Sequence, residues 1–188
     1  KGLYIQDATE VSVGSTDEMM DVMNAGSQNR SVAATRMNAT SSRSHSIFLV
    51  QVFQKNTKTG SEKQSKLFCC DLAGSEKVEK TEAKGSTLEE AKMINKSLSA
   101  LGNVINALTE SSKKNVFIPY RDSKLTRILQ ESLGGNSSTC LVITCSMSRY
   151  NDRETLSTLR FGNRAKSIKN AVKCNAQRSA KELQILLT

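Results

Sequence analysis

The chain has 188 residues, a length that fits one domain with a sizeable core, and its 27 Lys and Arg outnumber its 18 Asp and Glu. The formal net charge of +9 at pH 7 predicts a polyanionic partner, either nucleic acid or an acidic protein surface. An aromatic content of 4% without Trp supplies few stacking platforms, and no DNA- or RNA-binding motif is recognisable. A nucleic-acid-binding domain is therefore disfavoured.

The cysteines and the hydrophobic runs bear on where the protein works. No signal peptide is recognisable at Lys1, and no apolar run approaches the roughly 20 residues that a membrane helix needs. The cysteines lack both metal-ligand spacing and a disulfide-like pattern, so we expect buried thiols in a reducing compartment. These features predict a soluble, cytoplasmic protein without membrane insertion. The cysteines are Cys69, Cys70, Cys140, Cys145 and Cys174.

In the first part of the chain the pattern predicts one helix and one strand. Acidic Asp17 and Glu18 favour a helix start just before them. Three methionines on the apolar side of this helix are expected to pack in the core, namely Met19, Met20 and Met23. In order, we expect a loop or strand end over 1–13, a helix from residue 15 or 16 to Gly26, a polar loop over 27–46, a strand over 46–54 and a hairpin-like connection over 55–66.

Residues 67–71, Leu-Phe-Cys-Cys-Asp, predict a strand buried on both faces, because their hydrophobicity is continuous rather than alternating. Open α/β sheets bind ligands at the carboxyl ends of their strands. There Asp71 can hold Mg²⁺ through water, and Gly74 lets its N–H approach a phosphate. Asp-x-x-Gly alone is a weak signal. A second polar stretch over 38–45, also followed by a strand, strengthens it.

The rest of the chain is predicted to be mainly helical. A long helix over 87–110 carries an inner apolar stripe at helical spacing, formed by Ile94, Leu98, Leu101, Ile105 and Leu108. Leu156, Leu159 and Ala165 are expected to face inward from the last helix. In order, we expect a loop over 77–86, the long helix, a break over 111–119, a helix over 123–133 that stops at Gly134-Gly135, a core strand over 139–146, a last helix over 152–168, linker from 169 and a helix start over 179–187.

Four stretches resemble, in the same order, motifs of the kinesin motor domain. Asn38-x-x-Ser-Ser-Arg-Ser-His45 is similar to switch I, and Asp71-Leu-Ala-Gly-Ser-Glu76 to switch II. Residues 94–103 and 119–127 resemble the microtubule-binding helix and the loop after it. The likeness runs from about Lys1 to Asn170 and is closest to conventional, kinesin-1-type motors of the fungal sort.

The resemblance implies an α/β fold, the carboxyl-terminal part of a kinesin-type P-loop NTPase with a mixed central β-sheet flanked by helices. It assigns residues 1–168 to the motor domain and 169–188 to the neck linker and the start of the neck. No Gly-x-x-x-x-Gly-Lys-Ser/Thr stretch occurs in the chain, whereas the family places this P-loop upstream of switch I. We therefore expect half of a motor domain, which needs the missing N-terminal half as a partner to complete an ATP site.

The same resemblance implies roles at the nucleotide. Ser42 would reach Mg²⁺ and the γ-phosphate, and Ser41 the γ-phosphate or the attacking water. Asp71 would hold a metal-bound water, and Gly74 would donate its N–H to the γ-phosphate. The remaining assignments are Asn38 at the nucleotide and a charge-assisted pair between Arg43 and Glu76 that links the two switches. For His45, a structural hydrogen bond and a direct phosphate contact both stay open.

Basic residues in the matching helices and loops imply a tubulin-binding surface. Tubulin is acidic, so such charges would steer and hold the motor with an affinity that falls as salt rises. Each single Lys is equally compatible with solvated surface charge, and Glu82 puts an acid into the tubulin-facing loop, where the family's closest members have Gly. Arg121 and Lys124 match the family's tubulin contacts most directly. The full set is Lys77, Lys80, Lys84, Lys92, Lys96, Arg121, Lys124 and Arg127.

The function implied is a microtubule-based motor, a microtubule-stimulated ATPase that uses ATP and Mg²⁺. A non-catalytic microtubule-binding module is the alternative, favoured for this chain by the absence of a P-loop motif. A homodimer through a downstream stalk stays open, because residues 174–188 depart from conventional necks and do not themselves indicate dimerisation.

Overall fold

The computed structural model describes residues 4–36, 44–74, 86–110 and 116–177. Its elements combine a small sheet with four α-helices, as the α/β expectation requires. They are α1 (Thr16–Arg36), β1 (Ser46–Lys55), β2 (Glu62–Asp71), α2 (Ser86–Thr109), α3 (Lys124–Ile128), α4 (Asp152–Ala165) and β3 (Ala176–Gln177), with short 3₁₀ turns η3 (Tyr120–Asp122), η4 (Leu129–Ser132) and η5 (Arg149–Asn151).

The strands β1 and β2 form one long antiparallel hairpin, in register from Ser46 opposite Asp71 to Lys55 opposite Glu62. The predicted strand over 46–54 is confirmed, but the predicted connection over 55–66 is too long, because β2 already begins at Glu62. Its first residues are polar and lie on an exposed surface, so their composition gave no strand signal. The tight turn uses Gly60, whose φ of 72° favours glycine.

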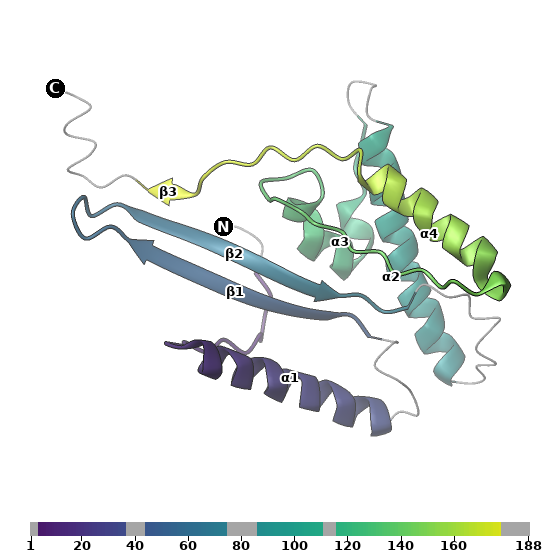
Figure 1. The fold of residues 1–188 in the computed structure, drawn as a ribbon, viewed down its shortest axis with the longest axis horizontal. Coiled ribbons are helices and arrows are strands. Elements are labelled where there is room, and N and C mark those ends of the chain that lie inside the picture. The colour runs from purple at the N-terminus through teal and green to yellow at the C-terminus, as the bar shows by residue number, and fades with distance from the viewer. Residues whose placement is uncertain (1–3, 37–43, 75–85, 111–115, 178–188) are drawn as a thin grey trace.

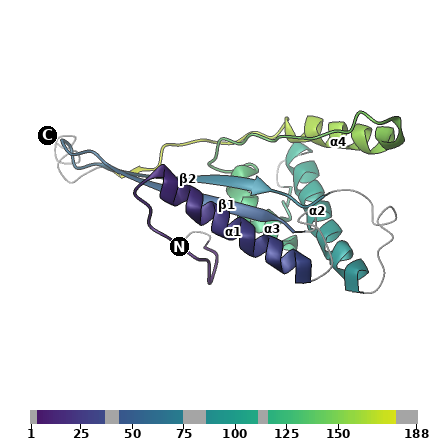
Figure 2. The same cartoon turned by 60° about the horizontal axis from the view of Figure 1, so that its bottom comes forward.

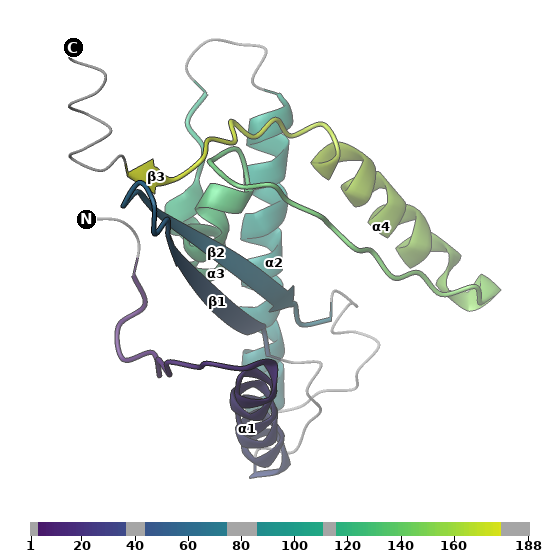
Figure 3. The ribbon, with the colours of Figure 1, turned by 60° about the vertical axis from the view of Figure 1, so that its left-hand side comes forward.

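Residues after α4 return to this hairpin. The segment from 169 runs back past the helices and ends in β3, which pairs antiparallel with the start of β2 (Figures 1 and 2). The sheet order is therefore β1-β2-β3, and every strand pair among the described residues is antiparallel. The hairpin lies between α1 on one side and the α2–α3 helices on the other (Figures 1 and 3).

The core forms where α2 meets the α3–η4 segment. Leu101, Val104 and Ile105 of α2 are buried against Leu125, Leu129 and Leu133. Leu98 and Leu108 pack against this cluster, so the predicted inner stripe of α2 is confirmed for each member whose side chain is described, while Ile94 lies outside that part. Burial of these aliphatic side chains is the main favourable term that fixes α2 relative to α3.

The helix α1 does not end at Gly26, as predicted, but continues to Arg36. Gly26 does not adopt a positive φ, and a single glycine inside a helix costs only about 1 kcal/mol relative to Ala. The predicted polar loop over 27–46 is correspondingly wrong for its first ten residues. The methionines of α1 take no part in the core cluster, and Met20 is 40% exposed.

Several segments expected to be buried are exposed. Most β2 residues lie open to solvent in the described chain, although β1 pairs with one edge of β2 and β3 with a short part of the other. The predicted core strand over 139–146 pairs with no strand among the described residues, and Val142 is 80% exposed.

All five cysteines are exposed, so the expectation of buried thiols is wrong. Leu156 and Leu159 are also about half exposed, at 49% and 51%, whereas Ala165 packs against the core as predicted.

The predicted helix over 123–133 is present but changes from α to 3₁₀ at Leu129. Ser123 caps it, since its hydroxyl accepts the N–H of Thr126 at 3.0 Å. Thr126 is completely buried and donates its hydroxyl to the Tyr120 carbonyl at 2.7 Å. The helix ends before Gly134, which has a φ of +87°. The last helix, α4, ends at Ala165, three residues before the predicted end.

Candidate functional site

The candidate site lies at one end of the β1–β2 hairpin. Because Ser46 pairs with Asp71, the residues just before β1 and just after β2 lie at the same edge of the sheet. These are the ends of the two stretches that resemble switch I and switch II. The hairpin register therefore brings together two polar segments that the sequence singled out separately.

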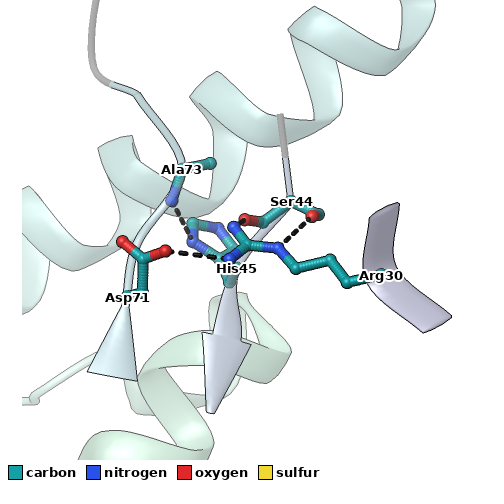
Figure 4. Close-up of polar contacts among 5 residues, drawn as sticks. All are labelled: Arg30, Ser44, His45, Asp71 and Ala73. Atoms are coloured by element: carbon teal, nitrogen blue, oxygen red, sulfur yellow. Dashed lines mark hydrogen bonds and ion pairs between the residues drawn. The ribbon is translucent and has the colours of Figure 1, made fainter. Parts of the chain in front are cut away.

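Arg30 of α1 joins both segments through its guanidinium (Figure 4). Its Nη1 donates to Asp71 Oδ2 at 2.8 Å, and its Nε and Nη2 donate to the hydroxyl and carbonyl oxygens of Ser44 at 3.1 and 2.7 Å. The Arg30 side chain is 23% exposed and that of Asp71 is 74% exposed. One planar group thus fixes the start of β1 and the end of β2 to α1.

His45 makes the second connection. Its Nδ1 accepts the backbone N–H of Ala73 at 3.0 Å, and its Nε2 lies 2.7 Å from the hydroxyl oxygen of Ser97 on α2. An Nδ1 that accepts carries no proton, so the neutral ring has its proton on Nε2 and donates it to Ser97. Burial lowers the pKa of His45 below its usual value, and the positive charge of Arg30 lowers it further. Both effects favour the neutral ring.

Asp71 and Gly74 are the two predicted nucleotide-site residues that the structure describes, and both lie at this edge. The partner of Asp71 is Arg30, which the sequence analysis did not name. The other predicted members of the site lie outside the described residues, so the Arg43–Glu76 pair stays a prediction. These members are Asn38, Ser41, Ser42, Arg43 and Glu76.

Among the described residues, no group of three or more His, Cys, Asp or Glu could hold a metal ion such as Mg²⁺. Mg²⁺ is commonly bound through one or two carboxylates and keeps several waters. The exposed carboxylate of Asp71, at the carboxyl end of its strand, suits that chemistry. Asp71 therefore suits a Mg²⁺ ion that is held mainly by phosphate oxygens and water, and not one that is enclosed by protein ligands.

The predicted track-binding residues occupy two described regions. Arg121 in η3 and Lys124 at the start of α3 are exposed, and Lys96 is exposed on α2. Arg127 is half-buried and donates to the side-chain oxygen of Gln130 at 2.7 Å. Lys92 lies in α2, but its side chain is outside the described part, as are Lys77, Lys80 and Lys84 altogether.

The start of the predicted linker is held by asparagine side chains. Asn170 donates its amide to the carbonyls of Ser132 and Ser137 at 3.1 and 2.6 Å, and its oxygen accepts the N–H of Gly134 at 2.7 Å. Further along, Asn136 donates to the side-chain oxygen of Asn175 at 2.9 Å. The segment predicted to be a linker is therefore attached to the loop after η4 and, through β3, to β2.

Sequence reasoning missed Arg30 and Ser97. The predicted helix end at Gly26 leaves Arg30, the first basic residue after Lys1, in a loop. Ser97 sits within the 94–103 motif, but its helical spacing alone does not indicate which residue it faces. The structure pairs Ser97 with His45, and it supports the structural role that was one of two readings for His45.

Comparison with known proteins defines the class. A family model for the kinesin motor domain matches residues 1–168. The chain is 62% identical over 188 residues to kinesin-related protein 3 of Dictyostelium discoideum and 65% identical over 187 residues to a kinesin heavy chain of Syncephalastrum racemosum. Both alignments cover 100% of this chain, but only 16% and 20% of those proteins.

Solved structures of kinesins are also similar to this chain. The structure of a fast kinesin matches 100% of this chain with a TM-score of 0.85 and 63% identity, over 52% of its own length. A KIF14 motor, described as a dimer bound to a microtubule with AMP-PNP, matches 97% with a TM-score of 0.86 and 41% identity, also over 52%. The chain thus has the expected fold class, part of a kinesin-type P-loop NTPase. It belongs to the kinesin motor domain family, and it spans about half the length of these solved chains.

Within the described residues, no helix is both long and apolar enough to cross a membrane.

Proposed function

We propose that this chain forms the switch-bearing and track-binding part of a microtubule motor that hydrolyses ATP in the cytoplasm. The observation that carries the proposal is the joining of three segments at one edge. Arg30 binds the ends of both switch-like stretches. His45, the last residue of the first stretch, binds Ala73 of the second and Ser97 of α2, the helix that carries the exposed Lys96. A phosphate-sensing edge and a candidate track-binding helix are therefore in direct contact.

On the nucleotide side, Ser42 and Asp71 would hold Mg²⁺, which when bound neutralises charge on the transferred phosphoryl group. The N–H of Gly74 would donate to the γ-phosphate, while Ser41 would orient the attacking water and Asn38 would contact the nucleotide. The cradle around the phosphates would come from a P-loop outside this chain, because the 188 residues contain no such motif.

On the track side, exposed basic residues on α2 and on the η3–α3 segment would meet the acidic tubulin surface. Lys96, Arg121 and Lys124 are exposed, and α2 packs against α3 through the main core, so these charges belong to one rigid body. A change at the phosphate edge that moves α2 would therefore move the whole surface. Residues 169–177, attached to β2 and the η4 loop, would follow as a neck linker.

Two measurements test the proposal. Cosedimentation should show that the chain binds microtubules, with an affinity that decreases as salt increases. A longer motor protein, in which a P-loop-bearing segment precedes residue 1, should hydrolyse MgATP faster when microtubules are present. Microtubule binding without any turnover in the longer protein would favour the non-catalytic binding module. No binding at low salt would contradict both functions.

A further inference from the structure

Three segments of the chain meet at the imidazole of the only histidine in the sequence. His45 precedes β1, Ala73 follows β2, and Ser97 lies on α2. The ring nitrogens lie 3.0 Å from the Ala73 backbone nitrogen and 2.7 Å from the Ser97 hydroxyl oxygen. Each nitrogen of the ring therefore has a protein partner, and this geometry argues against a phosphate as the ligand of His45.

We propose that His45 is a positioning residue that couples the phosphate edge of the hairpin to helix α2 through its two ring nitrogens. The inference rests on the proposed function, since it assigns the side chain through which that function would be transmitted. It concerns described residues alone and is separate from the predicted Arg43–Glu76 pair.

The contact with Ala73 places the ring next to Gly74, the proposed phosphate donor. Ala73 is 5% exposed, so water cannot readily replace His45 as the acceptor of its N–H. A buried donor without a partner costs more than an ordinary hydrogen bond contributes. Ala73 is also the residue before Gly74, whose N–H is the proposed phosphate donor. A displacement of Gly74 toward a phosphate would thus pull on the imidazole directly.

The contact with Ser97 places the ring next to the track-binding surface. Ser97 is followed by Leu98 and Leu101, which anchor α2 in the core, and preceded by the exposed Lys96. Because α2 packs as one body with α3, a force on Ser97 acts on the helix and not on a single side chain. Among the described residues at this edge, Arg30 and Asp71 are charged, and they contact each other and Ser44.

The first test is a direct observation of the ring. Because the chain has one histidine, nitrogen-15 NMR of the full chain labelled at histidine gives one pair of ring signals. We expect a neutral ring at pH 7 with the proton on Nε2. Ser97→Ala should shift the Nε2 signal and leave Nδ1 almost unchanged. A proton on Nδ1, or no response to Ser97→Ala, would overturn the inference.

The second test measures coupling in a motor that contains this chain and a P-loop segment. The quantity is the ratio of microtubule affinities with a non-hydrolysable ATP analogue and with ADP, since coupling between two sites is reciprocal. Ser97→Ala removes the bond to α2. His45→Asn keeps an acceptor near Ala73 but cannot reach Ser97. Each should reduce the ratio by about three- to tenfold, the order expected for one hydrogen bond.

Controls separate this role from a merely structural one. Ser97→Thr keeps the hydroxyl and should restore the ratio, whereas Ser157→Ala, at an exposed position on helix α4 outside both proposed sites, should leave it unchanged. If Ser97→Ala and His45→Asn lower thermal stability but keep the ratio, His45 is only structural and the inference fails while the motor function stands. A wild-type motor whose affinity ignores the nucleotide would instead contradict the proposed function, and this inference with it.

Discussion

Arg30 and Asp71, which are 41 positions apart in the sequence, form an ion pair in which the guanidinium Nη1 lies 2.8 Å from the carboxylate Oδ2. The same guanidinium binds Ser44 twice. Helix α1 is therefore attached to both strands at the open end of the hairpin by one side chain that is mostly shielded from solvent. This arrangement makes α1 part of the candidate site and not only a support for it.

The first prediction concerns this pair. Arg30→Gln and Asp71→Asn should each lower the free energy of unfolding of the chain, by about 1 kcal/mol, and the double variant should be little worse than Arg30→Gln alone. Urea denaturation measures all three. The matched control is the exposed pair Lys55–Glu62, at 3.1 Å, whose coupling should be below about 0.5 kcal/mol. Additive losses at Arg30 and Asp71 would show that the two residues act independently.

A second prediction follows from the end of the α3–η4 segment. A Cβ at Gly134 would lie 2.9 Å from Leu108 Cδ2 and 3.3 Å from the Tyr120 hydroxyl, and the φ of +87° is itself unfavourable for alanine. Gly134→Ala should therefore destabilise the chain by about 1–3 kcal/mol in thermal or urea unfolding. Gly102→Ala on α2 is the control, because among the described residues no atom beyond its own helix backbone lies within 4 Å of the position a Cβ would take. It should be neutral or stabilising by up to about 1 kcal/mol. Equal effects at both glycines would refute this account.

How far the sequence predicted the fold depends on whether a feature is local. The spacing of Leu101 and Ile105 predicted the buried face of α2, because this signal lies within one helix. The apolar runs over 67–71 and 139–146 predicted burial that the described chain does not provide. Apolar composition indicates that burial of a strand would be favourable. Whether the strand is buried depends on which other segments cover it.

The same distinction between local and non-local features applies to the residues of the candidate site. Asp71 and Gly74 were found because their spacing is a local motif at the end of a strand. Arg30 and Ser97 were not, since each acts through a partner dozens of positions away on another element. The predicted helix ended at Gly26, ten residues before α1 ends, so Arg30 fell in a predicted loop. In a loop the sequence pattern does not indicate which way a side chain points. Contacts between elements follow from packing, which single-sequence periodicity does not determine.

A third prediction concerns nucleotide binding by the chain itself. Titration calorimetry of residues 1–188 should show MgATP binding that is very weak or absent, because most phosphate donors at such sites come from the P-loop backbone and its lysine. The longer motor with a P-loop segment is the positive control. Micromolar affinity of the isolated chain would mean that its own residues form a complete phosphate site.

A fourth prediction tests the track-binding surface. In the longer motor, Arg121→Ala or Lys124→Ala should weaken microtubule binding by about two- to fivefold at low salt, the range for exposed charge pairs. The difference from wild type should shrink as salt rises, since screening weakens all exposed pairs. Lys58→Ala at the tip of the β1–β2 hairpin removes an equal charge away from this surface and should have little effect. A salt-independent affinity in all variants would rule out an electrostatic surface at Arg121 and Lys124.

The last prediction concerns the pair that the resemblance implies between the two switches. Arg43 directly precedes Ser44, and Glu76 comes two residues after Gly74. Ser44 and Asp71 are already held at one edge by Arg30, and His45 binds Ala73 at the same place. The described ends of the two switch-like segments, at Ser44 and Ala73, therefore lie close together, and the resemblance implies a charged hydrogen bond between Arg43 and Glu76.

Such a bond contributes roughly 1.5–3 kcal/mol when water is excluded, enough to bias a two-state loop about tenfold or more. An exposed pair would contribute less than about 1 kcal/mol. In the longer motor, Arg43→Ala and Glu76→Ala should each leave nucleotide binding largely intact but strongly reduce microtubule-stimulated hydrolysis. The double variant should be little worse than either single one, because the two residues would act as a unit. Steady-state ATPase assays with and without microtubules measure this, and losses that simply add would show that the two switches are not joined through Arg43 and Glu76.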